Sequence, residues 1–165
     1  MLPKTLSASY FRSFIFGVED SLVSTVGLLA GVAIANVDRK TIFLTGLILI
    51  FVEAFSMAAG SFISEQSVEE LVHKNKVPVR RSIYAGSIMF LSYFVSGFIP
   101  LAPYIFMSVE NGLRWSIAFS LLALFILGIL GAKATSRNPI ESGLRMFLVG
   151  GLAIGVGIFV GSLIK

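Results

Sequence analysis

Residues 41–64 read TIFLTGLILIFVEAFSMAAGSFIS, a run that is apolar almost throughout and contains one ionisable residue, Glu53. As an α-helix this run spans roughly 36 Å, which is enough to cross a bilayer core of about 30 Å. A carboxylate inside such a span costs about 2.5 kcal/mol or more to insert. Glu53 therefore needs a partner or a function. Met57 follows four residues later and shares its helix face.

The composition is that of an integral membrane protein. Of the 165 residues, 56% are hydrophobic and only 13% are charged, and the mean hydropathy is +0.91. A soluble domain has about 25% charged residues. The chain has no Cys, which excludes disulfides and thiolate metal sites. The net charge of +4 comes from basic residues that border the apolar runs, so we attribute it to membrane topology and expect no nucleic-acid partner.

Five apolar runs predict five transmembrane helices in a single transmembrane domain over residues 1–165. The runs cover about 14–35, 41–64, 82–101, 113–134 and 143–164. Barrel strands would be half as long and would alternate in polarity. We expect the second helix to extend to about Lys74, giving 41–74, because no helix breaker precedes Pro78. The fold class predicted is therefore an all-α membrane protein.

The distribution of Lys and Arg predicts the orientation, because basic residues accumulate on the cytoplasmic side. One side carries nine of them: Lys4, Arg12, Lys74, Lys76, Arg80, Arg81, Lys133, Arg137 and Arg145. The other side carries four: Arg39, Lys40, Arg114 and Lys165. The N-terminus is therefore predicted to be cytoplasmic. We expect no signal peptide, and residues 5–12 form either a short interfacial helix or a frayed start.

Three pairs of glycines are spaced for close packing between helices. Small residues four apart let helix backbones approach in lipid, where no hydrophobic force drives association. The pairs are Gly27 with Gly31, Gly151 with Gly155, and Gly157 with Gly161.

The first apolar run contains two adjacent acids, Glu19 and Asp20, within FGVEDSLVSTVGLLAG. Asp20 lies roughly 9 Å from the predicted cytoplasmic end of its run, and Met57 lies roughly 10 Å from the same end of the second run. Glu53 lies a turn or so deeper. Antiparallel neighbours would thus bring Asp20 and Met57 to one level.

These side chains suit a divalent cation. Carboxylates supply hard oxygen ligands and a thioether adds a softer donor, a mixture that favours Fe2+ or Mn2+ over Mg2+ or Ca2+. A carboxylate in an apolar setting also holds a proton readily when the metal is absent. We therefore predict metal/proton antiport, with Asp20 and Met57 as ligands and Glu53 as a ligand or proton carrier. No resident cofactor is expected.

Each candidate residue also has a plainer interpretation. Asp20 with Ser21 could cap a helix that begins later, Glu19 could be interfacial, and Met57 could simply pack. Glu53 could make a structural hydrogen bond to Ser or Tyr. Three acids follow the second run: Glu65, Glu69 and Glu70. Together with Glu19 they could form an entrance that attracts cations, or they could belong to a solvated helix end.

The two acidic stretches also resemble a known family. FGVEDSLVSTVGLLAG and EAFSMAAGSFISEQS, with PLAPYIF at residues 100–106 and the glycine-rich last run, are similar to the vacuolar iron transporter family. The resemblance implies a five-helix protomer and a homodimer with the path at the subunit interface. It also implies proton-coupled export of Fe2+ or Mn2+ from the cytosol. The family's translocation Asp and Met match Asp20 and Met57, whereas Glu53 is added from the reasoning above.

The chain departs from the family pattern at several places. Glu19 and Ser21 stand where the family usually has Asn and Gly, and Ser61 stands where Glu is common. The family's Glu-rich cytoplasmic domain between the second and third helices is missing, which makes this a short form. The membrane would be the plasma membrane in a prokaryote and a vacuolar or other organelle membrane in a eukaryote.

Two other functions remain open from the sequence. One is transport of another cation by a membrane carboxylate, and the other is a non-transporting membrane scaffold whose buried acids are structural. No nucleophile–His–acid set or phosphate-binding loop is present in the sequence, so we do not expect an enzyme.

Overall fold

The structure is a computed structural model that describes residues 4–73, 79–135 and 137–164. In these residues all the regular structure is helical. The helices are α1 (Lys4–Ile34), α2 (Arg39–His73), α3 (Arg80–Leu101), α4 (Pro103–Phe106), α5 (Val109–Thr135) and α6 (Pro139–Leu163). Five of them are long and apolar enough to cross a membrane, and only the single-turn α4 is not. The predicted all-α membrane class is confirmed, and the chain is a multi-pass integral membrane protein.

The helices begin earlier than the apolar runs do. The structure starts α1 at Lys4 rather than near residue 14, so the stretch 5–12 continues α1 instead of forming a separate interfacial helix. In the same way α5 and α6 start before residues 113 and 143. The prediction placed each start at the first apolar residue, whereas a helix continues through polar turns outside the lipid. The structure describes α2 as far as His73, and the predicted end at Lys74 and break at Pro78 lie outside the described residues.

Two polar residues cap helices at their N-terminal ends. The Asp38 carboxylate accepts hydrogen bonds from the backbone N–H groups of Lys40 and Thr41 and from the Thr41 hydroxyl, at 3.0, 3.1 and 2.6 Å. The Asn138 side chain accepts from Ile140 N–H at the start of α6. Such caps satisfy backbone donors that have no partner inside the helix, so they define where α2 and α6 begin.

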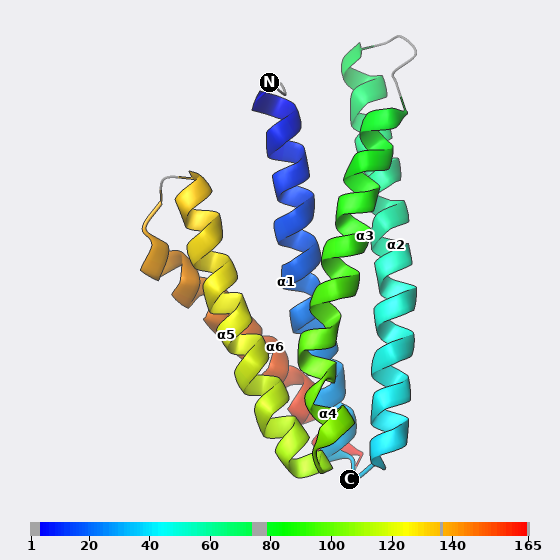
Figure 1. The fold of residues 1–165 in the computed structure, drawn as a ribbon, viewed down its shortest axis with the longest axis vertical. Coiled ribbons are helices and arrows are strands. Elements are labelled where there is room, and N and C mark those ends of the chain that lie inside the picture. The colour runs from blue at the N-terminus through cyan, green and yellow to red at the C-terminus, as the bar shows by residue number, and fades with distance from the viewer. Residues whose placement is uncertain (1–3, 74–78, 136, 165) are drawn as a thin grey trace.

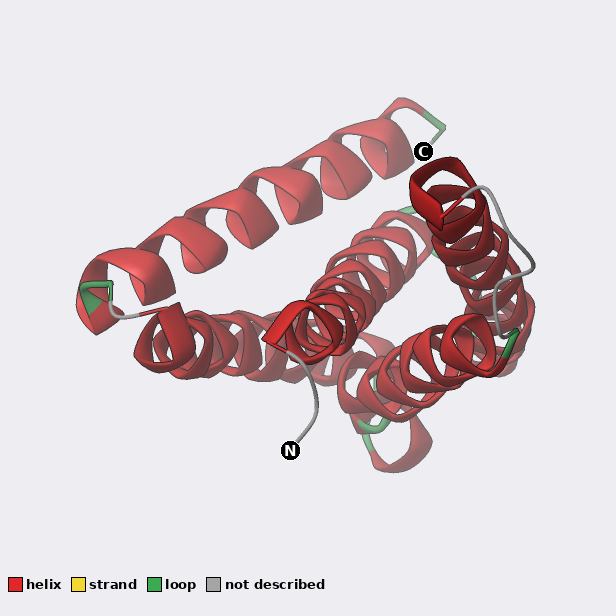
Figure 2. Cartoon of the chain, turned by 90° about the horizontal axis from the view of Figure 1, so that it is seen from above, coloured by secondary structure: helices red, strands yellow, loops and turns green. Residues whose placement is uncertain are grey.

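α1 lies at the centre of the bundle and packs against all four other long helices. Figure 1 shows α2 and α3 side by side, while α5 and α6 lean away from them towards the end where the N-terminus lies. In the view from above, α1 lies between the α2–α3 pair and the α5–α6 pair (Figure 2). The central helix is thus the one that contains Glu19 and Asp20.

Glycines let α1 and α6 cross at close range. A Cβ atom on Gly157 would collide with the carbonyl oxygen of Gly27, and one on Gly161 would collide with that of Gly31. The predicted packing role therefore holds for two of the three glycine pairs, which meet each other. The third pair, Gly151 with Gly155, has open space where a Cβ atom would lie.

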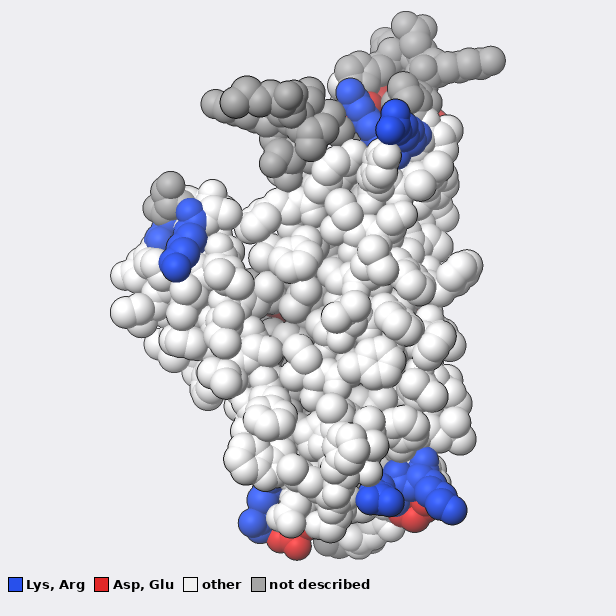
Figure 3. Space-filling model, in the orientation of Figure 1, with Lys and Arg blue, Asp and Glu red and all other residues white. Residues whose placement is uncertain are grey.

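Charged residues collect at the ends of the molecule. Figure 3 shows Lys and Arg side chains towards the two ends and a broad, almost uncharged surface between them. This uncharged band is what a protein surrounded by lipid chains presents. The predicted cytoplasmic position of the N-terminus stays a prediction.

Candidate functional site

Three helices converge around the two carboxylates singled out in the sequence. A Cβ atom on Gly97 of α3 would lie 2.7 Å from Ile50 Cγ1 of α2 and 3.0 Å from Ser21 Oγ of α1. The missing side chain at Gly97 therefore allows α1, α2 and α3 to meet in one layer. Asp20 is next to Ser21 and Glu53 is about one turn from Ile50, so both acids belong to this layer.

Asp20 and Glu53 approach each other from antiparallel helices. Their carboxylates lie within electrostatic range of each other, and both lie within range of Tyr93 on α3. Each acid is partly buried. Within residues 4–73, 79–135 and 137–164, neither carboxylate makes a hydrogen bond or an ion pair. The structure thus brings the two predicted acids together and leaves their oxygens available.

Tyr93 is fixed in place by α1. Its backbone carbonyl accepts a hydrogen bond from Ser21 Oγ at 2.6 Å, and its hydroxyl is 2.8 Å from Ser24 Oγ. The residue is fully buried. A buried Tyr with a bonded hydroxyl is a rigid polar group, and here it lies beside Asp20 and Glu53.

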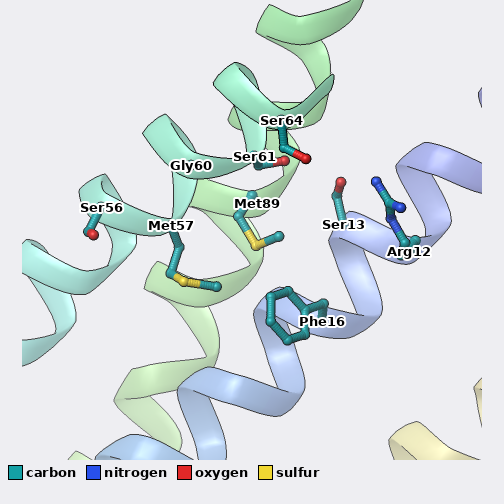
Figure 4. A pocket seen from close by; sticks show the side chains of 9 residues that line it. All are labelled: Arg12, Ser13, Phe16, Ser56, Met57, Gly60, Ser61, Ser64 and Met89. Atoms are coloured by element: carbon teal, nitrogen blue, oxygen red, sulfur yellow. The ribbon is translucent and has the colours of Figure 1, made fainter. Parts of the chain in front are cut away.

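Met57 lies in a groove next to this layer. The groove has a volume of about 610 Å³ and is lined by α1, α2 and α3. Its lining residues are Arg12, Ser13, Phe16, Ser56, Met57, Gly60, Ser61, Ser64 and Met89. Figure 4 shows the Met57 side chain extending from α2 towards the space between the helices, with Phe16 of α1 opposite.

The register between α1 and α2 differs from the predicted one by about a turn. The sequence predicted Asp20 and Met57 at one level with Glu53 deeper. In the structure Glu53 is the residue in electrostatic range of Asp20, while Met57 shares its groove with Ser13 and Phe16, nearer the start of α1. The prediction assumed that Phe14 and Ser64, the ends of the two apolar runs, lie at one level. In the structure Ser9 of α1 bonds to Glu65 of α2, so the two helices are shifted relative to each other.

Glu19 is the neighbour of Asp20 on α1. It is partly buried and lies within electrostatic range of Asp20. Adjacent residues of an α-helix point about 100° apart, so Glu19 and Asp20 face different directions. The predicted entrance role of Glu19 stays a prediction.

The three candidate entrance acids of α2 each have a partner. Glu65 is buried, accepts from Ser9 Oγ at 2.8 Å and lies 3.7 Å from the Arg12 guanidinium. Arg81 of α3 pairs with Glu69 at 3.1 Å. Glu70 accepts from the Gln66 amide at 2.9 Å and is exposed. These contacts tie α2 to both α1 and α3 at this end, and the predicted entrance role stays a prediction.

The carboxylates of Asp20 and Glu53 do not form a complete metal site by themselves. In the part of the chain that the structure describes, no three side chains of His, Cys, Asp or Glu are grouped so that they could hold a metal ion. Asp20 and Glu53 are a pair, and Met57 adds a thioether about a turn away.

Two residues of the site were missed in the sequence. Tyr93 and Met89 both lie in the third apolar run, which contains no acid and so attracted no functional interpretation. The available signal was the clustering of Ser92, Tyr93 and Ser96 in an otherwise apolar helix, since buried hydroxyls need partners.

Comparison with known proteins gives a consistent result. The model of the VIT family matches residues 11–83 and 72–162. "Vacuolar iron transporter homolog 3" of Arabidopsis thaliana is 29% identical over 163 residues, which cover 90% of this chain and 80% of that protein. An uncharacterized protein of Methanocaldococcus jannaschii is 26% identical over 166 residues, covering 90% and 86%. "Vacuolar iron transporter 1" of Tulipa gesneriana is 35% identical over 75 residues, covering 45% and 30%.

The family match extends over nearly the whole bundle, including the acidic stretches of α1 and α2. The chain therefore belongs to the VIT family, which is a family of transporters and not of enzymes.

Proposed function

We propose that this protein exports Fe2+ or Mn2+ from the cytosol in exchange for protons. The observation that supports this most directly is the pairing of Asp20 and Glu53. Two carboxylates from antiparallel membrane helices approach each other without a hydrogen-bonding or basic partner among the described residues. Leaving partly buried carboxylates unpaired within membrane helices is costly, which argues against a purely structural role and for a transported ligand.

The donor set favours a transition metal over a hard cation. Carboxylate oxygens from Asp20 and Glu53 neutralise a doubly charged ion, and the Met57 thioether adds a donor that Mg2+ and Ca2+ do not use. The relatives named vacuolar iron transporter homologs support iron as one cargo. The same carboxylates carry protons when no metal is bound, so one site serves both ions in turn.

A homodimer completes this proposal. One protomer offers two carboxylates and a nearby thioether, which is fewer ligands than a six-coordinate Fe2+ or Mn2+ ion requires. The groove beside Met57 is bordered by α1 and α2, so two copies facing each other across these helices would enclose one path between them. The path would cross a vacuolar membrane in a eukaryote or the plasma membrane in a prokaryote.

Purified protein in liposomes provides the test. Metal uptake and proton movement are followed together across Fe2+, Mn2+, Zn2+ and Co2+, with Mg2+ as the hard control. We expect Fe2+ or Mn2+ entry to be accompanied by proton flow in the opposite direction. Transport of some other cation without these metals would support a different cargo, and the absence of any flux would support a scaffold.

Variants locate the site in the same assay. Asp20→Asn and Met57→Ala should each reduce metal flux by about tenfold or more, the size of loss seen when metal-site groups are removed. Met107→Leu, which lies at the opposite end of the bundle in the connection before α5, is the matched control and should keep the wild-type flux. Unchanged flux in both site variants would rule out this site.

A further inference from the structure

A second methionine shares the groove of Met57. Met89 of α3 lines the same space and is only 5% exposed. In Figure 4 the side chains of Met57 and Met89 extend from different helices towards the same opening, with their sulfur atoms on the groove side. No feature of the sequence alone placed these two residues together.

The contact between α2 and α3 fixes their common level. A Cβ atom on Gly86 of α3 would lie 2.9 Å from the carbonyl oxygen of Ala58 of α2. Met57 is adjacent to Ala58, and Met89 lies three residues after Gly86, on the same helix face. Both methionines are therefore within about one helical turn of a close crossing.

A glycine in α1 makes room for the Met89 sulfur. A Cβ atom on Gly17 would lie 3.1 Å from Met89 Sδ. Any larger residue at this position would push the thioether aside. Gly17 thus lets the sulfur of a buried α3 residue reach the region between α1 and α2, where Ser13 and Phe16 form the other wall.

The groove lining is chemically unlike the carboxylate pair. Its residues include two thioethers and four serine hydroxyls, and they include no acid. Arg12 is the one charged lining residue, and its guanidinium lies 3.7 Å from the Glu65 carboxylate, which offsets its charge. Neutral sulfur donors attract cations by polarisability rather than by charge, so they favour soft metals over hard ones.

We propose that Met57 and Met89 form a two-thioether site that selects soft and borderline transition-metal cations over hard cations. The site lies about one turn closer to the start of α1 than the Asp20–Glu53 pair. Met89 is its specificity-determining ligand. This inference deepens the proposed metal transport and rests on it, because the selected ion is the one that moves on to the carboxylates.

Binding measurements test the site without requiring transport. The full chain, purified in detergent, is titrated calorimetrically with Cd2+ as the soft probe and Mg2+ as the hard probe of equal charge. Met89→Leu should weaken Cd2+ binding by about tenfold while leaving Mg2+ binding essentially as in the wild type. Met107→Leu, with its methionine outside the groove, should bind both ions as the wild type does.

The pairing of the two sulfurs gives a second readout. Met57→Leu should also lose the preference for the soft ion over the hard ion. The double variant Met57→Leu/Met89→Leu should lose little more than either single variant, because removing one sulfur already breaks the pair. The proposal is overturned if Met89→Leu binds Cd2+ as the wild type does, or if both metals weaken equally. If Met89→Leu fails to fold, an unchanged preference for Cd2+ over Mg2+ in Met57→Leu overturns the proposal.

Transport assays in liposomes distinguish a failure of the thioether site from a failure of the proposed metal transport. Wild-type protein that binds Cd2+ through both methionines but moves no metal in liposomes contradicts the transport proposal alone. Wild-type protein that carries Fe2+ or Mn2+, with a metal preference that Met89→Leu does not alter, contradicts the thioether site alone.

Discussion

The hydroxyl groups of Ser24 in α1 and Tyr93 in α3 lie 2.8 Å apart, beside both Asp20 and Glu53. This hydrogen bond joins the first and third spans at the level where the carboxylates of the first and second spans meet. The third span is therefore part of the site although it contributes no acid.

Removing the Ser24–Tyr93 bond should loosen α3 from α1. We expect Tyr93→Phe and Ser24→Ala each to lower the free energy of unfolding by about 1 kcal/mol, the usual contribution of such a bond. Thermal unfolding in detergent measures both variants and their combination. The double variant should be little worse than either single one, because each already breaks the bond. Fully additive losses would contradict the coupling.

Glu53→Gln should change the pH dependence of transport more than any other single change in the site. The amide keeps the shape and hydrogen-bonding capacity of the side chain but cannot exchange a proton. We expect metal flux in Glu53→Gln liposomes to vary little with pH, whereas wild-type flux varies with the proton gradient. Glu141→Gln, on the polar first turn of α6, is the control. An identical pH profile in Glu53→Gln and wild type would count against proton carriage by Glu53.

The α1–α6 crossing offers a matched pair of glycine variants. Gly157→Ala should destabilise the protein by about 1–3 kcal/mol through overpacking, because its Cβ would collide with the backbone of Gly27. Gly155→Ala adds the same methyl group to open space on the same helix and should be neutral or slightly stabilising. Thermal unfolding of the two variants under one condition makes the comparison. Equal effects would mean that the crossing does not limit stability.

Variants of Glu65 and Glu70 compare the loss of a buried contact with the loss of an exposed contact at the C-terminal end of α2. Glu65→Ala removes a buried carboxylate and leaves the partly buried Ser9 hydroxyl without its acceptor, and it should cost about 1–3 kcal/mol. Glu70→Ala removes an exposed contact to Gln66 and should change the free energy of unfolding by less than about 0.5 kcal/mol. Proteolysis of the α1 N-terminal turns provides a local measurement. Equal protease sensitivity in the two variants would contradict the tie between α1 and α2.

The Asp38 cap makes the start of α2 sensitive to acid. The hydrogen bond from the Thr41 hydroxyl, followed by the Thr41 backbone N–H, lowers the pKa of Asp38 below its ordinary value of 3.8. A lowered folded-state pKa stabilises the cap fully above 3.8, and the stabilisation disappears as the pH falls through the lowered value. Hydrogen exchange at Thr41 and Ile42 should therefore accelerate below that pH.

Variants of Asp38 test separately the hydrogen bonds of the cap and the charge of its carboxylate. Asp38→Asn retains an acceptor oxygen and should protect these amides without the acid-dependent loss. Asp38→Ala should expose them at every pH. Protection in Asp38→Ala equal to that of the wild type would show that the cap does not hold the first turn.

The sequence was sufficient for the helix count because each span is a long apolar run, and a bilayer leaves few alternatives to a helix. It also identified Asp20 and Glu53, since an acid in such a run is conspicuous. The level of one helix relative to another could not be predicted from the sequence. It depends on backbone crossings such as Gly97 against Ile50 and Gly86 against Ala58, and no single run contains that information.

The clustering of Tyr93 with Ser92 and Ser96 was visible in the sequence, but the α1 residues that Tyr93 and Met89 contact were not, for a related reason. Each is an ordinary residue for an apolar helix, and its role comes only from the neighbours that the fold supplies. Tyr93 acquires its role from Ser21 and Ser24 of α1. Met89 acquires its position from the gap left by Gly17.

The central position of α1 has a consequence for biosynthesis. This helix leaves the ribosome before the other described helices, yet Gly27 and Gly31 on one of its sides pack against α6, which follows all of them. Until α2 and α3 follow, its two acids are without their neighbours, which makes early release into lipid unfavourable. We therefore expect the insertion machinery to retain the first span until the later ones arrive, so that truncation before Pro139 leaves a chain that is degraded rather than a smaller stable bundle.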